Sequence, residues 1–536
     1  NISSFSFGTM IGWQSPTMPQ LQSENPPVGN RPMTKEAASW LTGIMCLTAA
    51  LTSLIIGAIV NRFGHKVTGY LIALAHCTTW LFIIFATQHT YLFIGLFFSG
   101  ISGGMTLFSV PLYVSEIASD GIRGMLGSLM VFVLNGGILF GYVLGALLPY
   151  QWYSITMFAF PLFYIATFPF LPESPVYLVR NNRINEASRQ AQAISSLSSS
   201  FNRPIAYTHN TRNFRTTSLT WLRSGQKLLV EQEMLRLQQE AKEINVSGPL
   251  TNKLSELFRD RATIKGLCIT LGMFCGQQLA GIFIMISYTE TIFKMSGSSL
   301  SPNDSAIIVG MIQVFGSWLS TTLMERAGRR PLFLISCLGM GTCHCVLGVF
   351  CYLQTLGYDV SQFSWISIIA LSVFMITYGL GMGPGPYVIS SEILSRDVSS
   401  LVVTLGMFTA WAIAFIVVKL FPTVVDFLGI HGCFFLLGTF CAITFAFIYI
   451  LVPETKGLPR QVILDRLNGV SSSSNSTQYV SSQEFNEKDV SLTRTSLRTF
   501  QSRNIVSKYL IVRSEHTCAG IYAGNETNKR ETVCLL

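Results

Sequence analysis

The sequence predicts an all-α membrane protein with twelve transmembrane helices arranged as two pseudo-repeated six-helix lobes. Three observations support this fold: an apolar composition, long apolar stretches that recur along the chain, and motifs that occur once in each half. Of the 536 residues, 49% are hydrophobic and only 12% are charged, whereas soluble domains carry about 25% charged residues. Because charged side chains keep a surface hydrated, this composition excludes an ordinary soluble protein.

Twelve apolar stretches are long enough to cross, as helices, a hydrocarbon core about 30 Å thick. The first starts at Asn1 inside its apolar run, without a basic leader, so we expect helix 1 to be truncated and recognise no signal peptide. The stretches lie near 1–21, 37–60, 67–86, 91–115, 125–147, 152–171, 264–289, 304–323, 331–353, 364–391, 401–425 and 431–452.

Positive charges gather in the loops that follow the even-numbered helices, while the other loops carry few. Since cytosolic loops of membrane proteins are enriched in lysine and arginine, we expect both termini to be cytosolic and the protein to be a multi-pass protein of the cell membrane. The charges that set this orientation include Arg62, His65, Lys66, Arg123, Arg326, Arg329, Arg330 and Arg396.

This topology divides the chain into four segments: lobes at 1–171 and 263–452, a cytosolic loop at 172–262 and a cytosolic tail at 453–536. Within the loop, 231–243 has the pattern of an amphipathic helix. The Ser-rich stretch 193–217 lacks helical periodicity, and we expect it to be a disordered insertion, as we do most of the tail.

The two lobes carry the same three signals in the same order. A basic turn with arginine and glycine follows helix 2 and helix 8, a glutamate follows helix 4 and helix 10, and a Pro-Glu pair follows helix 6 and helix 12. Such an ordered set indicates a duplicated six-helix unit, and parallel repeats of this kind build transporters with the binding site between the lobes. The matched residues are Arg62 and Gly64 with Arg326 and Gly328, Glu116 with Glu392, and Glu173 with Glu454.

Several motifs resemble those of the sugar porter family of the major facilitator superfamily: PESPVYL, QQLAG, ERAGRRPLF, GMGPGPY and PETKG. The resemblance covers 1–192 and 218–460, and EAASWLTG, NGGIL and DFLGIHGCFFLLG are most similar to the insect facilitated trehalose transporters. It implies a hexose or trehalose carrier that works by alternating access as a monomer. A small sugar and the lipid bilayer would be its partners, with no nucleic acid, cofactor, metal or catalytic residue.

Uncharged amides and aromatics within the spans are the candidate sugar-binding groups. An amide exchanges water for sugar hydroxyls without the desolvation cost of an ion, and on one continuous helix Gln277, Gly281 and Tyr288 would share a face. An interhelical polar clasp is the alternative role for Gln277 and Gln278, and close helix packing is the alternative for Asn135. By resemblance, the glutamine pair, the helix 8 amide and two aromatics match sugar-contacting positions. The candidates are Gln277, Gln278, Gln313, Tyr288, Tyr387, Trp411 and Asn135.

Glycine and proline patterns predict where helices break and where they pack closely. The stretch GMGPGPY should interrupt helix 10, because proline removes hydrogen bonds and glycine frees the backbone. Such a break beside a binding site acts as a gate in carriers of this kind, and its residues are Gly383, Pro384, Gly385 and Pro386. The row Gly137, Gly141 and Gly145 has the spacing of a close helix contact.

The cytosolic turns are expected to form a salt-bridge network that closes that side, by resemblance to the family. Asn61 and Ser399 replace an aspartate and an arginine of the family pattern, so we expect this closure to be weakened. The alternative is that hydrogen bonds from Asn61 substitute for the missing ion pair. The network residues are Arg62, Glu116, Arg123, Glu325, Arg326, Arg329, Arg330 and Glu392.

Departures from the family pattern bear on mechanism. Helix 1 reads Phe7-Gly8-Thr9-Met10 where proton symporters of the family carry an aspartate, and Leu96 replaces the helix 4 arginine, which favours facilitated diffusion. Phe283 and Ala410 replace asparagines that would recognise hydroxyls. A receptor-like or degenerate carrier and a proton-coupled symporter therefore stay open as alternatives. An enzyme is not expected, because the intramembrane histidines are scattered and no HExxH motif is present in a span.

Overall fold

A computed structural model describes residues 1–117, 120–171, 173–174, 177, 261–297, 300–394, 396–456, 458 and 460–468. The described residues are helical or lie in connections, and none of them forms a strand. The predicted amphipathic helix at 231–243, the insertion at 193–217 and the tail beyond 468 lie outside the described residues.

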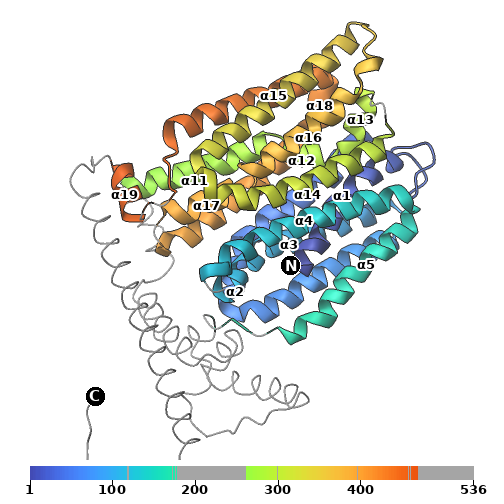
Figure 1. The fold of residues 1–536 in the computed structure, drawn as a ribbon. Helices are drawn as coiled ribbons and strands as arrows, with labels where there is room; N and C mark the ends of the chain where they lie inside the picture. The colour runs from blue at the N-terminus through green and yellow to red at the C-terminus, as the bar shows by residue number, and fades with distance from the viewer. Residues whose placement is uncertain are drawn as a thin grey trace, which may run out of the picture. The chain divides into compact units, whose positions relative to one another are not determined.

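The first six predicted spans form the N-terminal lobe. Two of them are joined in one 50-residue helical stretch, in which Gly64 alone is non-helical. The helices are α1 (Ile2–Leu21), α2 (Lys35–Ile84), α3 (His89–Ile117), α4 (Asp120–Leu147), α5 (Tyr150–Thr167) and the 3₁₀ turn η1 (Phe168–Phe170). Figure 1 shows them grouped together, from blue to teal.

The other six spans form the C-terminal lobe, in which two helices are broken and two are joined at Gly429. A short helix that the sequence analysis did not predict, α19, follows the last span. The elements are α11 (Arg261–Leu279), α12 (Ile282–Ser287), α13 (Thr289–Ser296), α14 (Pro302–Ala327), α15 (Arg329–Thr355), η2 (Ser361–Phe363), α16 (Trp365–Leu380), α17 (Gly385–Ile393), α18 (Arg396–Leu451) and α19 (Arg460–Asn468). The twelve-span, two-lobe prediction is thus confirmed (Figure 1).

The duplication is visible in the backbone of the two basic turns. Gly64 has φ +86° and ψ 176°, and Gly328 has φ +93° and ψ 157°. Residues with a side chain rarely adopt such angles, so both turns require glycine. Two glycines 264 residues apart therefore make the same turn in each lobe.

The glycine row of α4 packs directly against α1, as predicted. A methyl group added at Gly137 would lie 2.3 Å from the carbonyl oxygen of Phe5, and one at Gly141 would lie 2.9 Å from the Cα of Gly12. A methyl group at Gly145 would lie 2.4 Å from the ring of Pro16. Small residues on both helices let the backbones touch, which in lipid supplies the van der Waals contact that holds helices together.

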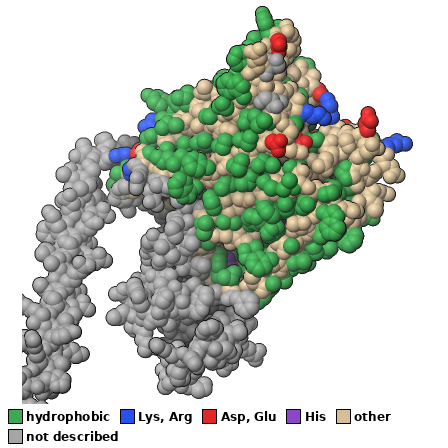
Figure 2. All heavy atoms as spheres, turned by 45° about the vertical axis from the view of Figure 1, so that its right-hand side comes forward, with side chains coloured by type: hydrophobic (Ala, Val, Ile, Leu, Met, Phe, Trp, Pro, Cys, Tyr) green, Lys and Arg blue, Asp and Glu red, His purple; other side chains and the backbone are tan. Residues whose placement is uncertain are grey.

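The outer surface of the helices is suited to lipid. Among the residues that the structure describes, seven helical stretches are long and apolar enough to cross a membrane. Two of them, Lys35–Ile84 and Leu401–Leu451, have about twice the length that one crossing needs. Figure 2 shows hydrophobic side chains spread over much of one face of the molecule, with few charged side chains among them. Large apolar side chains such as Leu74, Phe85 and Ile450 are more than 60% exposed. A soluble monomer rarely exposes so large an apolar surface.

Candidate substrate site and gates

The seventh span is interrupted where the first candidate residues lie. α11 ends at Leu279, Gly281 has φ +83°, and α12 begins at Ile282. A methyl group at Gly281 would lie 3.0 Å from Leu437, so neither the backbone angle nor the neighbouring side chain favours a larger residue. The prediction that Gln277, Gly281 and Tyr288 share the face of one continuous helix is therefore wrong. The helical repeat of α11 ends at the break, so Tyr288 no longer follows Gln277 along one helix face.

The tenth span breaks where the sequence predicted. α16 ends at Leu380 and α17 begins at Gly385, so Gly383 and Pro384 lie in the gap while Pro386 lies in the first turn of α17. Such a break leaves backbone carbonyl groups without their helical donors. The Gln277 amide nitrogen donates to the carbonyl oxygens of Met382 and Gly383, both at 2.8 Å. Gln277 thus joins the two broken helices of the C-terminal lobe.

Gln278 leaves one acceptor free. Its amide nitrogen donates to the Oε1 of Gln277 at 3.3 Å. Its own Oε1 is buried and has no hydrogen-bond partner among the described residues. A buried acceptor without a donor lowers the stability of the fold unless water or a ligand donates a hydrogen bond to it. Gln14 of α1, which the sequence analysis did not single out, also has a buried Oε1 of this kind.

A second amide cluster links the lobes. The Gln313 amide nitrogen of α14 donates to the Oδ1 of Asn135 on α4 at 3.1 Å, and the Asn135 amide nitrogen donates to the Ser317 hydroxyl group. Ser317, also missed at the sequence level, returns a hydrogen bond to the Gln313 carbonyl oxygen at 2.9 Å. The Gln313 Oε1 stays buried without a partner among the described residues. Asn135 and Gln313 therefore form a polar clasp between the lobes, which was not predicted for these two residues, and one acceptor is left over.

The three candidate aromatics differ in their surroundings. Tyr387 is 39% exposed, and its ring meets that of Phe274 edge-on, with centroids 5.1 Å apart. Trp411 is 4% exposed and lies between the rings of Phe7, at 6.1 Å, and Phe283, at 5.1 Å. Of these two aromatics, Tyr387 therefore offers much more free surface to a ligand.

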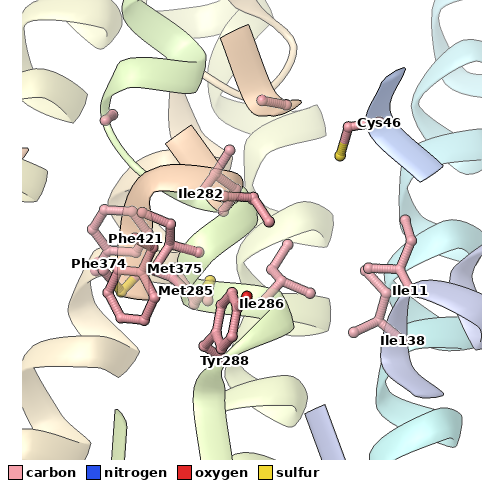
Figure 3. Packing of buried hydrophobic residues seen from close by; sticks show 14 of the residues in the cluster. Ile11, Cys46, Ile138, Ile282, Met285, Ile286, Tyr288, Phe374, Met375 and Phe421 are labelled. Carbon is pink, nitrogen blue, oxygen red and sulfur yellow. The ribbon is translucent and has the colours of Figure 1, made fainter. Parts of the chain in front are cut away.

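Tyr288 is buried in the contact between the lobes. Its ring packs against Phe421 with centroids 4.9 Å apart, and its hydroxyl group lies toward Thr42 of α2. In Figure 3, Tyr288 lies in the C-terminal lobe beside Met285 and Ile286, and Ile11 and Ile138 of the N-terminal lobe lie across from this group. The break at Gly281 therefore leaves Tyr288 facing the other lobe.

Polar contacts join the lobes at the end where α2 begins, called here the Lys35 end. Lys35 forms an exposed ion pair with Asp426 at 2.7 Å. Lys419 of α18 donates to the Ser39 hydroxyl group at 3.0 Å, and its ammonium nitrogen lies 4.7 Å from the centroid of the Trp40 ring. The sequence analysis missed these residues, because nothing in the local pattern relates the start of α2 to a position almost 400 residues later.

At the opposite end, each basic turn is held by the glutamate of a Pro-Glu pair. Glu173 accepts from the backbone N–H groups of His65 at 3.0 Å and Lys66 at 3.1 Å. Glu454 accepts from those of Arg329 and Arg330, both at 3.1 Å. Burial opposes ionisation of Glu454, yet four backbone N–H donors hold its pKa below the ordinary value. Neither glutamate was assigned to the network from sequence, although the repeated Pro-Glu signal pointed to both.

A second acid completes each turn by contacting a basic side chain of that turn. Glu116 accepts from the Ser174 hydroxyl group and lies 3.0 Å from the His65 Nε2. Its counterpart Glu392 accepts from the Thr455 hydroxyl group and lies 3.2 Å from the Arg329 guanidinium. Histidine in the first lobe thus occupies the place of arginine in the second, 264 residues later.

The other predicted network residues lie at the edge of these turns. Arg62 is exposed, and its guanidinium lies 5.5 Å from the centroid of the Phe63 ring. Arg330 donates to the Tyr449 carbonyl oxygen at 2.6 Å. The side chains of Arg123, Glu325 and Arg326 lie outside the described part of the structure. Among the described residues, these contacts of the basic turns join groups of one lobe, so closure between lobes at this end stays a prediction.

The buried side chain of His344 packs against aromatic rings. His344 lies between the rings of Phe374, at 4.9 Å, and Phe434, at 6.1 Å, and its Nε2 is 3.0 Å from the Ala280 carbonyl oxygen. Within the described residues, no three His, Cys, Asp or Glu side chains are placed to hold a metal ion.

Comparison with known proteins agrees with this architecture. A family model described as "Sugar (and other) transporter" matches residues 2–463. A facilitated trehalose transporter of Apis mellifera ligustica is 30% identical over 465 residues, covering 86% of each chain. One of Drosophila pseudoobscura pseudoobscura is 29% identical over 88% of this chain but 50% of its own length. The chain thus spans about half the length of several of its longer relatives.

Solved structures support the same fold. A partially occluded inward-open conformation of the xylose transporter XylE from E. coli has a TM-score of 0.64 at 18% identity, over 85% of this chain and 97% of that one. An inward-open conformation of the same transporter has a TM-score of 0.62. The chain belongs to the sugar (and other) transporter family, and its resemblance to sugar porters of the major facilitator superfamily is confirmed.

Proposed function

We propose that the protein is a facilitative sugar transporter that carries trehalose or a hexose by alternating access. The observation that carries the proposal is the pair of buried amide oxygens, on Gln278 and Gln313, that lack donors among the described residues. Sugar hydroxyl groups donate hydrogen bonds, and an uncharged acceptor receives them without the cost of desolvating an ion. Tyr387, with its free ring surface, would supply the apolar contact for one face of the sugar.

The absence of charge in α1 favours facilitated diffusion over proton coupling at that helix. None of the residues of Ile2–Leu21 is acidic or basic. A proton relay through the membrane interior requires an ionisable group there. Sugar would therefore move down its own gradient along this path.

The relatives' names support the class of substrate. Several are named facilitated trehalose transporters, and one solved neighbour is a xylose transporter. We infer for this chain a small neutral sugar as substrate and a monomer as the working unit. By the positive-inside pattern, the basic turns would face the cytosol, and the Lys35 end would face outward in the cell membrane.

The test is an uptake panel. Purified protein in vesicles is offered labelled trehalose, glucose and xylose, with and without a proton gradient. Equilibration of one sugar without accumulation supports the uniporter. Accumulation driven by the gradient would replace it with a symporter.

The second candidate is a receptor-like carrier, which binds sugar but transports little of it. The hydrogen bonds of Gln277 within the protein favour this candidate. Both hydrogens of its amide are taken by the carbonyl oxygens of Met382 and Gly383, so it cannot donate to a sugar without releasing the helix break. Phe283 also fills space beside Trp411. Saturable binding of a sugar in the same preparation, together with no measurable flux, would establish this candidate instead.

A further inference from the structure

Glu290 lies in the contact between the lobes near the Lys35 end. It belongs to the first turn of α13, beyond the membrane-spanning stretch Arg261–Ser287. Its backbone N–H donates to the hydroxyl group of Ser15 on α1 at 3.1 Å. On the preceding turn, Tyr142 of α4 donates to the Ile286 carbonyl oxygen at 2.8 Å. Two hydrogen bonds between the lobes therefore hold this segment in place.

The carboxyl group of Glu290 has little to stabilise a charge. Its Oε2 is buried and has no hydrogen-bond partner among the described residues. Of the elements packed against α13, α1, α12 and α16 contain no charged residue, and α14 carries Asp304 in its first turn and its other charges at the far end. Tyr142 presents a neutral hydroxyl group, so Lys294 on α13 itself is the charged group that acts on the carboxyl.

An ionised carboxyl in this place would be costly. Burial raises the pKa of Glu290 to about 7, against a smaller opposing effect of Lys294. In a state with the lobes separated at the Lys35 end, α13 would leave Ser15 and the carboxyl group would regain water. Its pKa then returns toward about 4.3, the value of a solvated glutamate.

We propose that Glu290 is a proton-binding site of the contact at the Lys35 end, which holds a proton while the lobes touch there and releases it when they separate. Low pH then favours contact between the lobes, and high pH favours their separation, because the proton is released when they separate. With the two pKa values above, the ratio of separated to touching molecules rises about tenfold between pH 6 and pH 8. The inference goes beyond sugar transport, since it holds for a carrier and for a receptor alike.

The experiment measures the distance across this contact without any sugar. Spin labels carried on unnatural amino acids replace Trp152 and Phe427, which are 65% and 86% exposed and lie near the Lys35 end on the two lobes. Distances are recorded by pulsed electron resonance on the full chain in lipid nanodiscs from pH 5 to pH 9. We expect a longer-distance population that grows as pH rises.

Two variants and a control separate the proposal from a general effect of pH. Glu290→Gln should abolish most of the pH response and keep the short distance, whereas Glu290→Asp should retain a response. Glu36→Gln, an exposed acid of the same end, should respond as the unmodified protein does. A pH response unchanged in Glu290→Gln, or no response in the unmodified protein, would overturn the proposal. Because no sugar is present, failure of the uptake panel would leave this result unaffected.

Discussion

At the scale of single residues, the two candidate glutamines have separate roles. Gln277 bonds to the freed carbonyl oxygens of Met382 and Gly383, while Gln278 keeps an unpaired acceptor. The local sequence cannot distinguish the two neighbours, because both are amides in the same apolar helix. Only the position of the broken tenth span beside them shows which of the two glutamines already has hydrogen-bond partners within the protein.

Gln278→Leu is expected to raise the KM of sugar uptake about 2- to 13-fold, because one hydrogen bond of about 0.5–1.5 kcal/mol to the sugar is lost. Uptake in vesicles over a range of sugar concentrations gives KM and the maximal rate separately. Gln354→Leu makes the same change at a residue that bonds to the Ser296 carbonyl oxygen near the end of α15. This control should leave KM unchanged; an equal rise in both variants would remove Gln278 from the site.

Glu454→Gln is expected to lower the melting temperature at pH 7. The native pKa of Glu454 is depressed, so its charge stabilises the fold above the ordinary glutamate pKa of about 4.3, and this contribution is lost as pH falls through the lower native value. Thermal melts at pH 7 and pH 4 test this expectation. The difference in melting temperature between variant and parent should be smaller at pH 4 than at pH 7. A gap that widens in acid would contradict the assigned sign.

At the scale of elements, the broken seventh and tenth spans lie side by side and depend on each other. The break at Gly281 lies one helical turn after Gln277, which bonds to the break between α16 and α17. The sequence predicted the second break from its prolines and glycines. It did not predict the first, because a lone glycine is also tolerated within a continuous helix.

Gly281→Ala is expected to destabilise the protein by roughly 1–3 kcal/mol, because a positive φ strains any residue with a side chain. The added methyl group would also lie 3.0 Å from Leu437. Gly136→Ala is the matched control, since a methyl group there meets nothing within 4 Å. Melting temperatures should fall for the first variant and hold or rise for the second. Equal behaviour of both would show that the seventh span does not need its break.

At the scale of the whole molecule, the two lobes meet through chemistry that differs from end to end. At the Lys35 end, Lys35 and Lys419 of opposite lobes bond to Asp426 and Ser39. In the middle, Asn135 meets Gln313. At the end with the basic turns, Glu173 and its counterpart Glu454 bond within their own lobes.

Lys35→Glu is expected to increase the separated population at the Lys35 end, because it replaces the ion pair with Asp426 by two like charges. The pair is exposed, so the effect should stay within about 1 kcal/mol, a change of fivefold or less in the population ratio. The distance between labels at Trp152 and Phe427 measures it. High salt should reduce the effect, and the double swap with Asp426→Lys should reverse it. A swap that fails to restore the distance would show that this pair does not hold the contact.

Much of this protein could be predicted from sequence, because its strongest signals are local. Apolar stretches of membrane-crossing length placed all twelve spans, and repeated motifs related the two lobes. The glycine turns at Gly64 and Gly328 were marked by their sequence partners. Partners of residues far apart in the chain could not be assigned. For that reason Ser317 and Asp426 went unrecognised, and Glu173 was marked as a repeated residue without its partners.

By itself, the sequence determined the membrane class, the number of spans, the internal duplication and the family, since each follows from composition, length or motifs along the chain. The tertiary structure decided which polar groups are already paired. It showed that the Gln277 amide nitrogen bonds to the carbonyl groups of the helix break, whereas the Gln278 amide oxygen has no donor among the described residues. It also placed Glu290, which the sequence shows only as one acid in QQLAGIFIMISYTETIF, in the contact between the lobes. The reason is physical: pairing and burial depend on neighbours from distant parts of the chain, and these become neighbours only when the lobes pack together.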